Sequence, residues 1–213
     1  METLTLDIER IKSPSPKVLM MYQAVSELIR GKMDIRSITV SDITKKAGIG
    51  KGTAYEYFSS KEELLASALV HEYGSKLKNL AATVQQPGDF FVRCGKIMDW
   101  LVDNREYNIM FSHILQSGME GQSGCDTICE QVPEELFAGI HTFLDTQIDK
   151  FMQSGYEAGV FTEQHVGKRR LAFVSAMMQY AMVVMEPKKR EYIELPDEEL
   201  REFIYQGMIK ALS

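Results

Sequence analysis

Residues 39–65 decide the fold, and they read TVSDITKKAGIGKGTAYEYFSSKEELL. Thr39 or Ser41 is a favourable N-cap for a short helix, because its side-chain oxygen accepts from the free backbone N–H groups of the first turn. Gly48 stands where such a helix ends with a positive-φ residue. A further short helix is expected over 51–58. The stretch therefore predicts two short helices joined by a tight, glycine-containing turn.

Apolar residues recur at helical spacing on both sides of this stretch, and no segment has the two-residue alternation of a strand. The expected fold is all-α, with an N-terminal three-helix helix-turn-helix domain followed by a helical C-terminal domain. We expect the domains to be an N-terminal arm (1–15), the helix-turn-helix (16–60) and the C-terminal domain (61–213), whose first helix connects the two. The other expected helices cover about 18–30, 91–101, 107–118, 133–155, 163–186 and 197–211, and one more begins after Ser59 or Ser60.

The residue types in the third helix suit entry into a DNA major groove. Small side chains let a helix backbone approach the bases closely, and Gly50, Gly52, Thr53 and Ala54 supply them. Hydroxyl and amine groups that suit phosphate contacts surround them. Phe58 is expected to anchor the helix in a small core. The phosphate-type residues are Thr39, Ser41, Lys51, Tyr55, Tyr57 and Lys61, and the core partners of Phe58 are Val25, Ile43 and Leu64.

The charge of the chain is unevenly distributed. The 213 residues contain 24 Lys+Arg and 30 Asp+Glu, a net charge of −6, with 45% hydrophobic and 25% charged residues, which excludes a disordered chain. Residues 30–61 hold seven basic and three acidic residues, whereas 79–213 hold 12 basic and 20 acidic ones. A basic segment on an acidic body indicates contact with a polyanion, although a modest cluster of this kind is also typical of a solvated face.

No membrane segment is expected. Acidic residues and no apolar core occupy the first twenty positions, so we expect no signal peptide. The apolar run 171–185 spans about 22 Å as a helix, less than the roughly 30 Å of a bilayer core. Three cysteines form no disulfide framework, and the predicted location is the cytoplasm.

The 39–65 stretch resembles the DNA-binding signature of the TetR family of transcriptional repressors. Thr-Val precedes the second helix, Ala-Gly-Ile forms the turn, Lys-Gly-Thr-x-Tyr-x-Tyr-Phe forms the recognition helix, and Lys-Glu-Glu-Leu-Leu opens the fourth helix. The resemblance covers about 18–70, and the rest agrees only in length and helical pattern. The family often has Ser or Thr where Gly50 stands and Leu or Ile where Ala54 stands. Both departures leave the preferred DNA sequence open.

The resemblance implies a sequence-specific DNA-binding regulator without enzymatic activity. Phosphate contacts would come from Thr39, Ser41, Tyr55, Tyr57 and Lys61, and the base-proximal residues would be Lys51, Gly52, Thr53 and Glu56. Tyr55 is also placed to contact both a phosphate and a base edge. Glu56 either accepts from a cytosine amino group or faces solvent.

The resemblance also implies that the C-terminal domain binds a small molecule that releases the protein from DNA. Nine of the thirteen methionines lie in 79–213, and methionine adapts to irregular apolar ligands, although such stripes are also typical of a simple core. We expect an apolar or amphipathic effector of unknown identity, with no other cofactor and no metal. The candidate pocket residues are Met98, Trp100, Tyr107, Met110, Phe111, His113, Phe137, His141, Phe151, Met178 and Met182.

The 163–186 segment is apolar on two sides, which predicts that one side packs in the domain and the other against a second copy. A homodimer also suits a palindromic double-stranded operator, because two recognition helices then meet major grooves about 34 Å apart. The candidate interface residues are Phe173, Met177, Tyr180, Val184, Phe203, Ile204 and Met208.

Other functions stay open at this point. An activator, or a regulator that needs a ligand in order to bind DNA, fits the same motifs. Cys125 and Cys129 lie four residues apart, a spacing that would suit a soft metal or an oxidant sensor. An enzyme lacks support, because the sequence has no phosphate loop, dinucleotide fingerprint or nucleophile elbow. A helical interaction module without DNA binding is the remaining class.

Overall fold

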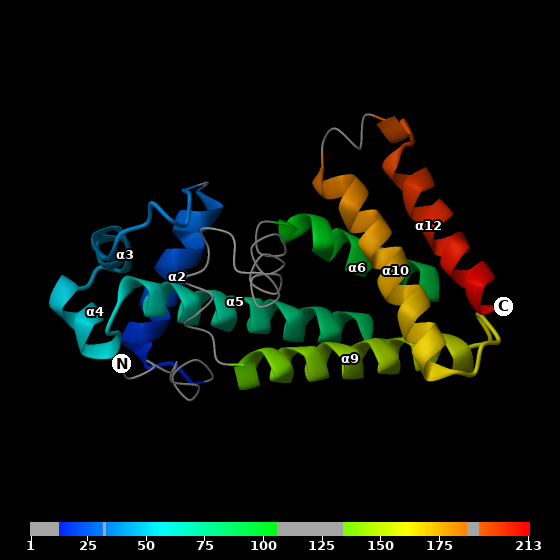
Figure 1. Cartoon of the computed structure of the whole chain (residues 1–213), viewed down its shortest axis with the longest axis horizontal. Helices are drawn as coiled ribbons and strands as arrows, with labels where there is room; N and C mark the ends of the chain where they lie inside the picture. The colour runs from blue at the N-terminus through cyan, green and yellow to red at the C-terminus, as the bar shows by residue number, and fades with distance from the viewer. Residues whose placement is uncertain (1–12, 32, 106–133, 187–191) are drawn as a thin grey trace. The chain divides into compact units, whose positions relative to one another are not determined.

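A computed structural model describes residues 13–31, 33–105, 134–186 and 192–213, with the side chains of 134–138 left out. Its regular elements in these ranges are helices, and none of these ranges contains a strand (Figure 1). The all-α prediction is confirmed. The helices are α2 (Pro16–Arg30), α3 (Val40–Ala47), α4 (Lys51–Tyr57), α5 (Lys61–Val84), α6 (Phe90–Asp103), α9 (Glu134–Glu157), α10 (Val166–Met185) and α12 (Asp197–Leu212).

Local sequence signals set the helix ends in the N-terminal part. Thr39 is the N-cap of α3 and forms a capping box with Asp42, while Gly48 ends α3 with φ +69°. Gly50 is the N-cap of α4 and supplies no side-chain hydrogen bond. At the start of α5 the Ser60 hydroxyl accepts from the Glu63 N–H at 3.0 Å. These caps confirm the predicted order of short helix, turn and short helix.

The chain divides into two compact units. Among the described residues, unit 1 contains 13–31, 33–77 and 134–140, and unit 2 contains 78–105, 141–186 and 192–213. The division falls inside α5, after Leu77. Residues 1–12 of the expected N-terminal arm (1–15) lie outside the described residues.

The core of unit 1 forms where α2, α3, α4 and the start of α5 meet. Val25, Ile43, Phe58 and Leu64 are all buried, which confirms the predicted anchor of the third helix. The ring centroids of Tyr22 and Phe58 lie 6.1 Å apart. Because these side chains close-pack, they fix the position of α4 on the core of unit 1, although this helix has only seven residues.

Unit 2 is built around α6, α10 and α12 with the C-terminal part of α9 (Figure 1). Phe90 stacks on Phe151 with ring centroids 4.7 Å apart, and its ring lies 5.8 Å from that of Phe161. The chain end is fixed as well, because the backbone N–H groups of Thr162 and Glu163 both donate to the carbonyl of Leu212.

A polar contact also ties the helices of unit 2 together. Arg201 donates to Asp99 on α6 and to Asp197 on its own helix, each at 2.6 Å, and lies over the ring of Tyr180 on α10. No helix in the described ranges combines the length and the hydropathy needed to cross a bilayer.

The two apolar sides of α10 differ in burial. Phe173, Met177 and Tyr180 are buried in unit 2, whereas Leu171, Met178 and Met182 are 67%, 59% and 54% exposed. The sequence predicts that one side of this helix packs inside the domain and the other contacts a second copy. It assigns Phe173, Met177 and Tyr180 to the contact with the second copy. In the structure this side packs on α6 and α12.

Candidate nucleic-acid interface

One face of α4 is fixed and the opposite face is open. Ala54 is 1% exposed and Phe58, which follows the helix, is also buried, so both face the core of unit 1. Lys51, Gly52, Tyr55 and Glu56 are exposed. The alanine at position 54 therefore lets α4 pack closely against unit 1 and leaves the other side of the helix free for a ligand.

None of the nine predicted DNA-contact residues is buried, and all come from α3, α4 and the residues beside them. The exposed ones are Thr39, Ser41, Lys51, Gly52, Tyr55 and Glu56, and the half-buried ones are Thr53, Tyr57 and Lys61. The tip of α4 and the start of α3 thus form one candidate surface, which we call the α3–α4 surface.

The Thr39 hydroxyl is already engaged in the capping box. It donates to Asp42 Oδ2 at 2.6 Å and accepts from the Asp42 N–H at 3.2 Å. The side-chain and then the backbone hydrogen bond from Thr39 lower the pKa of the Asp42 carboxyl. Thr39 therefore donates its hydroxyl proton to a phosphate only if it leaves Asp42.

The lysines around this surface differ in how much charge they leave uncompensated. Lys46 forms an ion pair with Glu27 at 2.9 Å, and its hydrogen bond lowers the pKa of the Glu27 carboxyl. Lys61 donates to the carbonyl of Arg36 at 3.3 Å, which orients its ammonium group. Within the described ranges, Lys45 and Lys51 are exposed and have no ion-pair partner. Lys45 is therefore an additional candidate for a phosphate contact.

The expected effector residues have different surroundings in the described chain. Met98 and Phe151 belong to the core of unit 2, Trp100 is half-buried, and His141, Met178 and Met182 are exposed. Tyr107, Met110, Phe111 and His113 lie outside the described residues, as does the side chain of Phe137.

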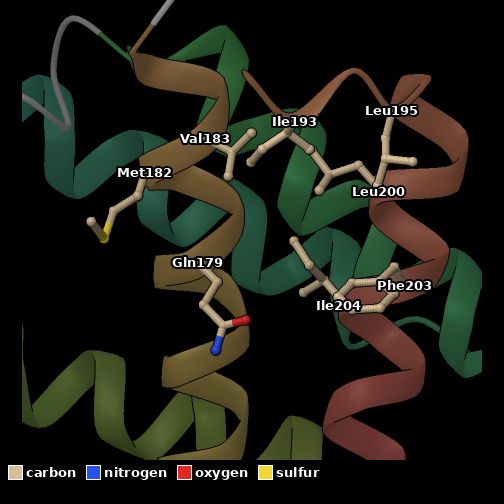
Figure 2. A pocket seen from close by; sticks show the side chains of 8 residues that line it. All are labelled: Gln179, Met182, Val183, Ile193, Leu195, Leu200, Phe203 and Ile204. Carbon is tan, nitrogen blue, oxygen red and sulfur yellow. The ribbon is translucent and has the colours of Figure 1, made fainter. Parts of the chain in front are cut away.

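An apolar groove of about 450 Å³ lies between α10 and α12, and Figure 2 shows Val183 of α10 on one side and Leu200 and Ile204 of α12 on the other. Sequence reasoning missed Ile193 and Leu195, which close one end of the groove. Their signal in the sequence is two apolar residues just before Pro196, between two prolines that indicate a loop. The lining residues are Gln179, Met182, Val183, Ile193, Leu195, Leu200, Phe203 and Ile204.

The expected interface residues fall into two sets. Phe203 is 71% exposed and borders the groove, and Val184 is half-buried. The other five, Phe173, Met177, Tyr180, Ile204 and Met208, are buried within the chain itself. These five fill the core of unit 2, so the exposed apolar surface of α10 and α12 is made by their neighbours.

No metal centre is found in the described part of the chain, where no three His, Cys, Asp or Glu side chains gather. Cys125 and Cys129 lie outside that part. Cys94 is buried, and burial raises the pKa of its thiol to about 12, which keeps it protonated and unreactive.

A family model described as "Bacterial regulatory proteins, tetR family" matches residues 32–68. The chain is 33% identical over 92 residues to the uncharacterized HTH-type transcriptional regulator YvdT of Bacillus subtilis (strain 168). That match covers 43% of this chain and 45% of YvdT. The chain spans less than half of the length of the curated relatives it matches.

Solved structures share the fold over nearly the whole chain. The fatty acid degradation regulator FadR of Bacillus halodurans has a TM-score of 0.57 at 19% identity, covering 93% of this chain and 96% of its own. FadR of Bacillus subtilis, solved in complex with stearoyl-CoA, has a TM-score of 0.53 at 18% identity, covering 92% and 97%. With the capped α3, the open face of α4 and the match over 32–68, the N-terminal part of the chain is similar to the tetR family of bacterial regulatory proteins.

Proposed function

We propose that the chain represses transcription as a homodimer on a palindromic operator and that a small apolar or amphipathic effector releases it. The main support is the open face of α4, held by Ala54 and Phe58 beside the uncompensated Lys51. Regulators of the TetR family are not enzymes, which agrees with the absence of catalytic motifs from the sequence.

In the proposed complex, α4 enters the major groove. Lys51, Gly52 and Glu56 face the base edges from the exposed side of this helix, and the half-buried Thr53 lies beside them. The phosphates on either side are held by Ser41, Tyr55, Tyr57 and Lys61, with Thr39 at the N-terminus of α3.

The proposed dimer uses the exposed apolar face of α10 and α12. Leu171, Met178 and Met182 are exposed at helical spacing, the half-buried Val174 lies between them, and Phe203 extends this face onto α12. An exposed apolar patch of this kind is typical of a protein interface. We assign the interface to these residues, because the other side of α10 already packs in the core of unit 2. Four helices, two from each copy, would meet there.

The effector class is supported by a relative. FadR of Bacillus subtilis was solved with stearoyl-CoA, a molecule with a long apolar chain and an anionic head. An amphipathic effector of this kind would favour a state in which the two recognition helices no longer match successive grooves. Its effect on DNA binding is limited by its difference in affinity for the two states.

The test is a gel shift with the DNA upstream of the coding region. The full-length protein is expected to bind it with an affinity that falls steeply with salt. Lys51→Ala is expected to weaken binding about tenfold or more, as loss of a base or phosphate contact does. Lys78→Ala removes an exposed lysine outside unit 1 and serves as the matched control. Equal affinity of the two variants, or no binding to any genomic fragment, would contradict the proposal.

A further inference from the structure

Arg169 is a buried cation without an acidic partner. It lies in the first turn of α10 and is 4% exposed. Its guanidinium lies over the ring of Tyr156, 5.0 Å from the centroid, and Nη2 donates to Gln153 Oε1 at 2.8 Å. Nε and Nη1 are buried and have no hydrogen-bond acceptor, and no carboxylate of the described chain forms an ion pair with this side chain.

Three other arginines of unit 2 have hydrogen-bond acceptors for their guanidinium groups. Arg170, next in sequence, is held by Asp149 and Asp145. Arg201 is held by Asp99 and Asp197. Arg93, the other mostly buried arginine of this unit, donates Nε to the carbonyl of Val84 at 2.7 Å. The missing acceptors thus distinguish Arg169 from its neighbours.

The contacts of Arg169 offset its burial only in part. An aromatic ring attracts a cation, and one amide oxygen satisfies one N–H. The other end of the Gln153 amide donates to Glu157 Oε1 at 2.8 Å, which turns the amide oxygen toward the guanidinium. A neutral amide leaves the positive charge uncompensated, and a buried charge without a counter-charge is strongly unfavourable. Three N–H groups on Nε and Nη1 remain without an acceptor.

We propose that Arg169 is the anion-binding residue of the effector site, and that the effector carries a carboxylate or phosphate group which accepts from Nε or Nη1. This inference rests on the proposed function, because it concerns the effector of the same regulator. It narrows the effector class from apolar or amphipathic to amphipathic with an acidic head. Tyr156 and the nearby aromatic core then provide apolar contacts beside the head group.

Loss of the charge-assisted hydrogen bonds is expected to weaken binding of such an acid about ten- to hundredfold. A neutral compound with the same tail gains nothing from Arg169. The wild-type protein is therefore expected to bind dodecanoate or dodecyl phosphate more tightly than 1-dodecanol. The relative affinity of the two acids tells which head group the site prefers.

Calorimetry measures the binding of these three compounds to the full-length protein. Binding of inorganic phosphate is measured by the change in melting temperature that it causes, relative to sodium chloride at equal ionic strength. The variants are Arg169→Gln, Arg169→Lys and Arg169→Met, with Arg170→Gln as the matched control that removes an adjacent, ion-paired arginine. Arg169→Gln is expected to bind acid and alcohol equally. Arg169→Lys keeps part of the preference, and Arg170→Gln keeps all of it.

Folding of the variants is part of the test. Because the charge of Arg169 is uncompensated in the unliganded protein, Arg169→Met is expected to melt no lower than the wild type. If Arg169→Met and Arg169→Gln both unfold, Arg169 has a structural role and the inference is wrong. It is also wrong if no anion distinguishes the wild type from Arg169→Gln.

Operator release separates this inference from the proposed function. If 1-dodecanol releases the operator and the acids bind no better to the wild type than to Arg169→Gln, the proposed function stands and the assignment of Arg169 falls. If the acids bind through Arg169 but do not release the protein from DNA, the anion site is supported and the proposed release by the effector is contradicted.

Discussion

The Thr39 hydroxyl lies 2.6 Å from Asp42 Oδ2, and the backbone N–H of Thr39 donates to the same oxygen at 3.0 Å. The pair closes the N-terminus of α3 beside the candidate DNA surface. One carboxylate thus fixes both the start of the helix and the rotamer of a residue predicted to touch phosphate. The same contact places a negative charge near the proposed phosphate site, a charge that the hydrogen bonds of Thr39 satisfy within the protein.

Loss of this cap is expected to destabilise unit 1. Thr39→Ala removes the side-chain acceptor of the first turn and is expected to cost about 1 kcal/mol of unfolding free energy. Thr39→Ser keeps the oxygen and is the control. Chemical denaturation followed by circular dichroism measures both variants. A Thr39→Ala protein as stable as Thr39→Ser would show that the cap contributes nothing.

The same pair predicts a pH dependence. Because the pKa of Asp42 is lowered on folding, ionised Asp42 stabilises the folded state above its ordinary pKa of 3.8, and this stabilisation is lost as pH falls through the folded pKa. Asp42→Asn removes that titration. Below pH 3.8 the difference in stability between the wild type and Asp42→Asn is therefore expected to become smaller. Melting temperatures measured from pH 7 to pH 2.5 test this. A gap that is independent of pH would contradict the assignment.

Two glycines of α9 are expected to respond in opposite directions to alanine. A Cβ at Gly155 would lie 2.7 Å from Phe90 Cε2 and 2.8 Å from Phe161 Cε1, whereas a Cβ at Gly139 meets nothing within 4 Å. Gly155→Ala is expected to cost about 1–3 kcal/mol through overpacking. Gly139→Ala on the same helix is expected to stabilise by about 0.5–1 kcal/mol, because alanine favours the helix. Denaturation midpoints compare the two variants.

The turn between α3 and α4 has a similar internal control. Gly48 has φ +69°, where an L side chain is strained, while Gly50 has a negative φ and open space at its Cβ position. Gly48→Ala is expected to cost about 1 kcal/mol, and Gly50→Ser to stabilise by a few tenths of a kcal/mol through the added cap. Equal effects of the two substitutions on the unfolding free energy would refute this reading of the turn.

A charge on the exposed face of α10 is expected to separate the proposed dimer. Met178→Glu places an uncompensated carboxylate at the proposed interface and is expected to weaken association about a hundredfold, following the cost of an unpaired charge in an interface. Val92→Glu changes an equally exposed apolar residue on α6 and is the control. Light scattering across a dilution series measures the mass. Loss of the dimer in Val92→Glu but not in Met178→Glu would move the interface to another face.

Prediction from the sequence succeeded where the cause is local. The cap at Thr39, the stop at Gly48 and the anchor at Phe58 each depend on residue types within a few positions. The expected start of α10 at 163 differs from the observed Val166, because His165 provides the cap: its Nδ1 accepts from the Lys168 N–H at 3.4 Å. A histidine cap is uncommon, so its signal was weak.

What the sequence determined is an all-helical chain with a helix-turn-helix near its N-terminus, since caps, turn glycines and helical periodicity act over short distances. The tertiary structure alone decided which side of α10 is buried. Both sides are apolar, so the pattern by itself cannot rank Phe173, Met177 and Tyr180 above Leu171, Met178 and Met182. Packing against α6 and α12 selects the first set, while Arg169, one turn before Phe173, is buried beside Gln153 and Tyr156 of α9 and has no acidic partner there.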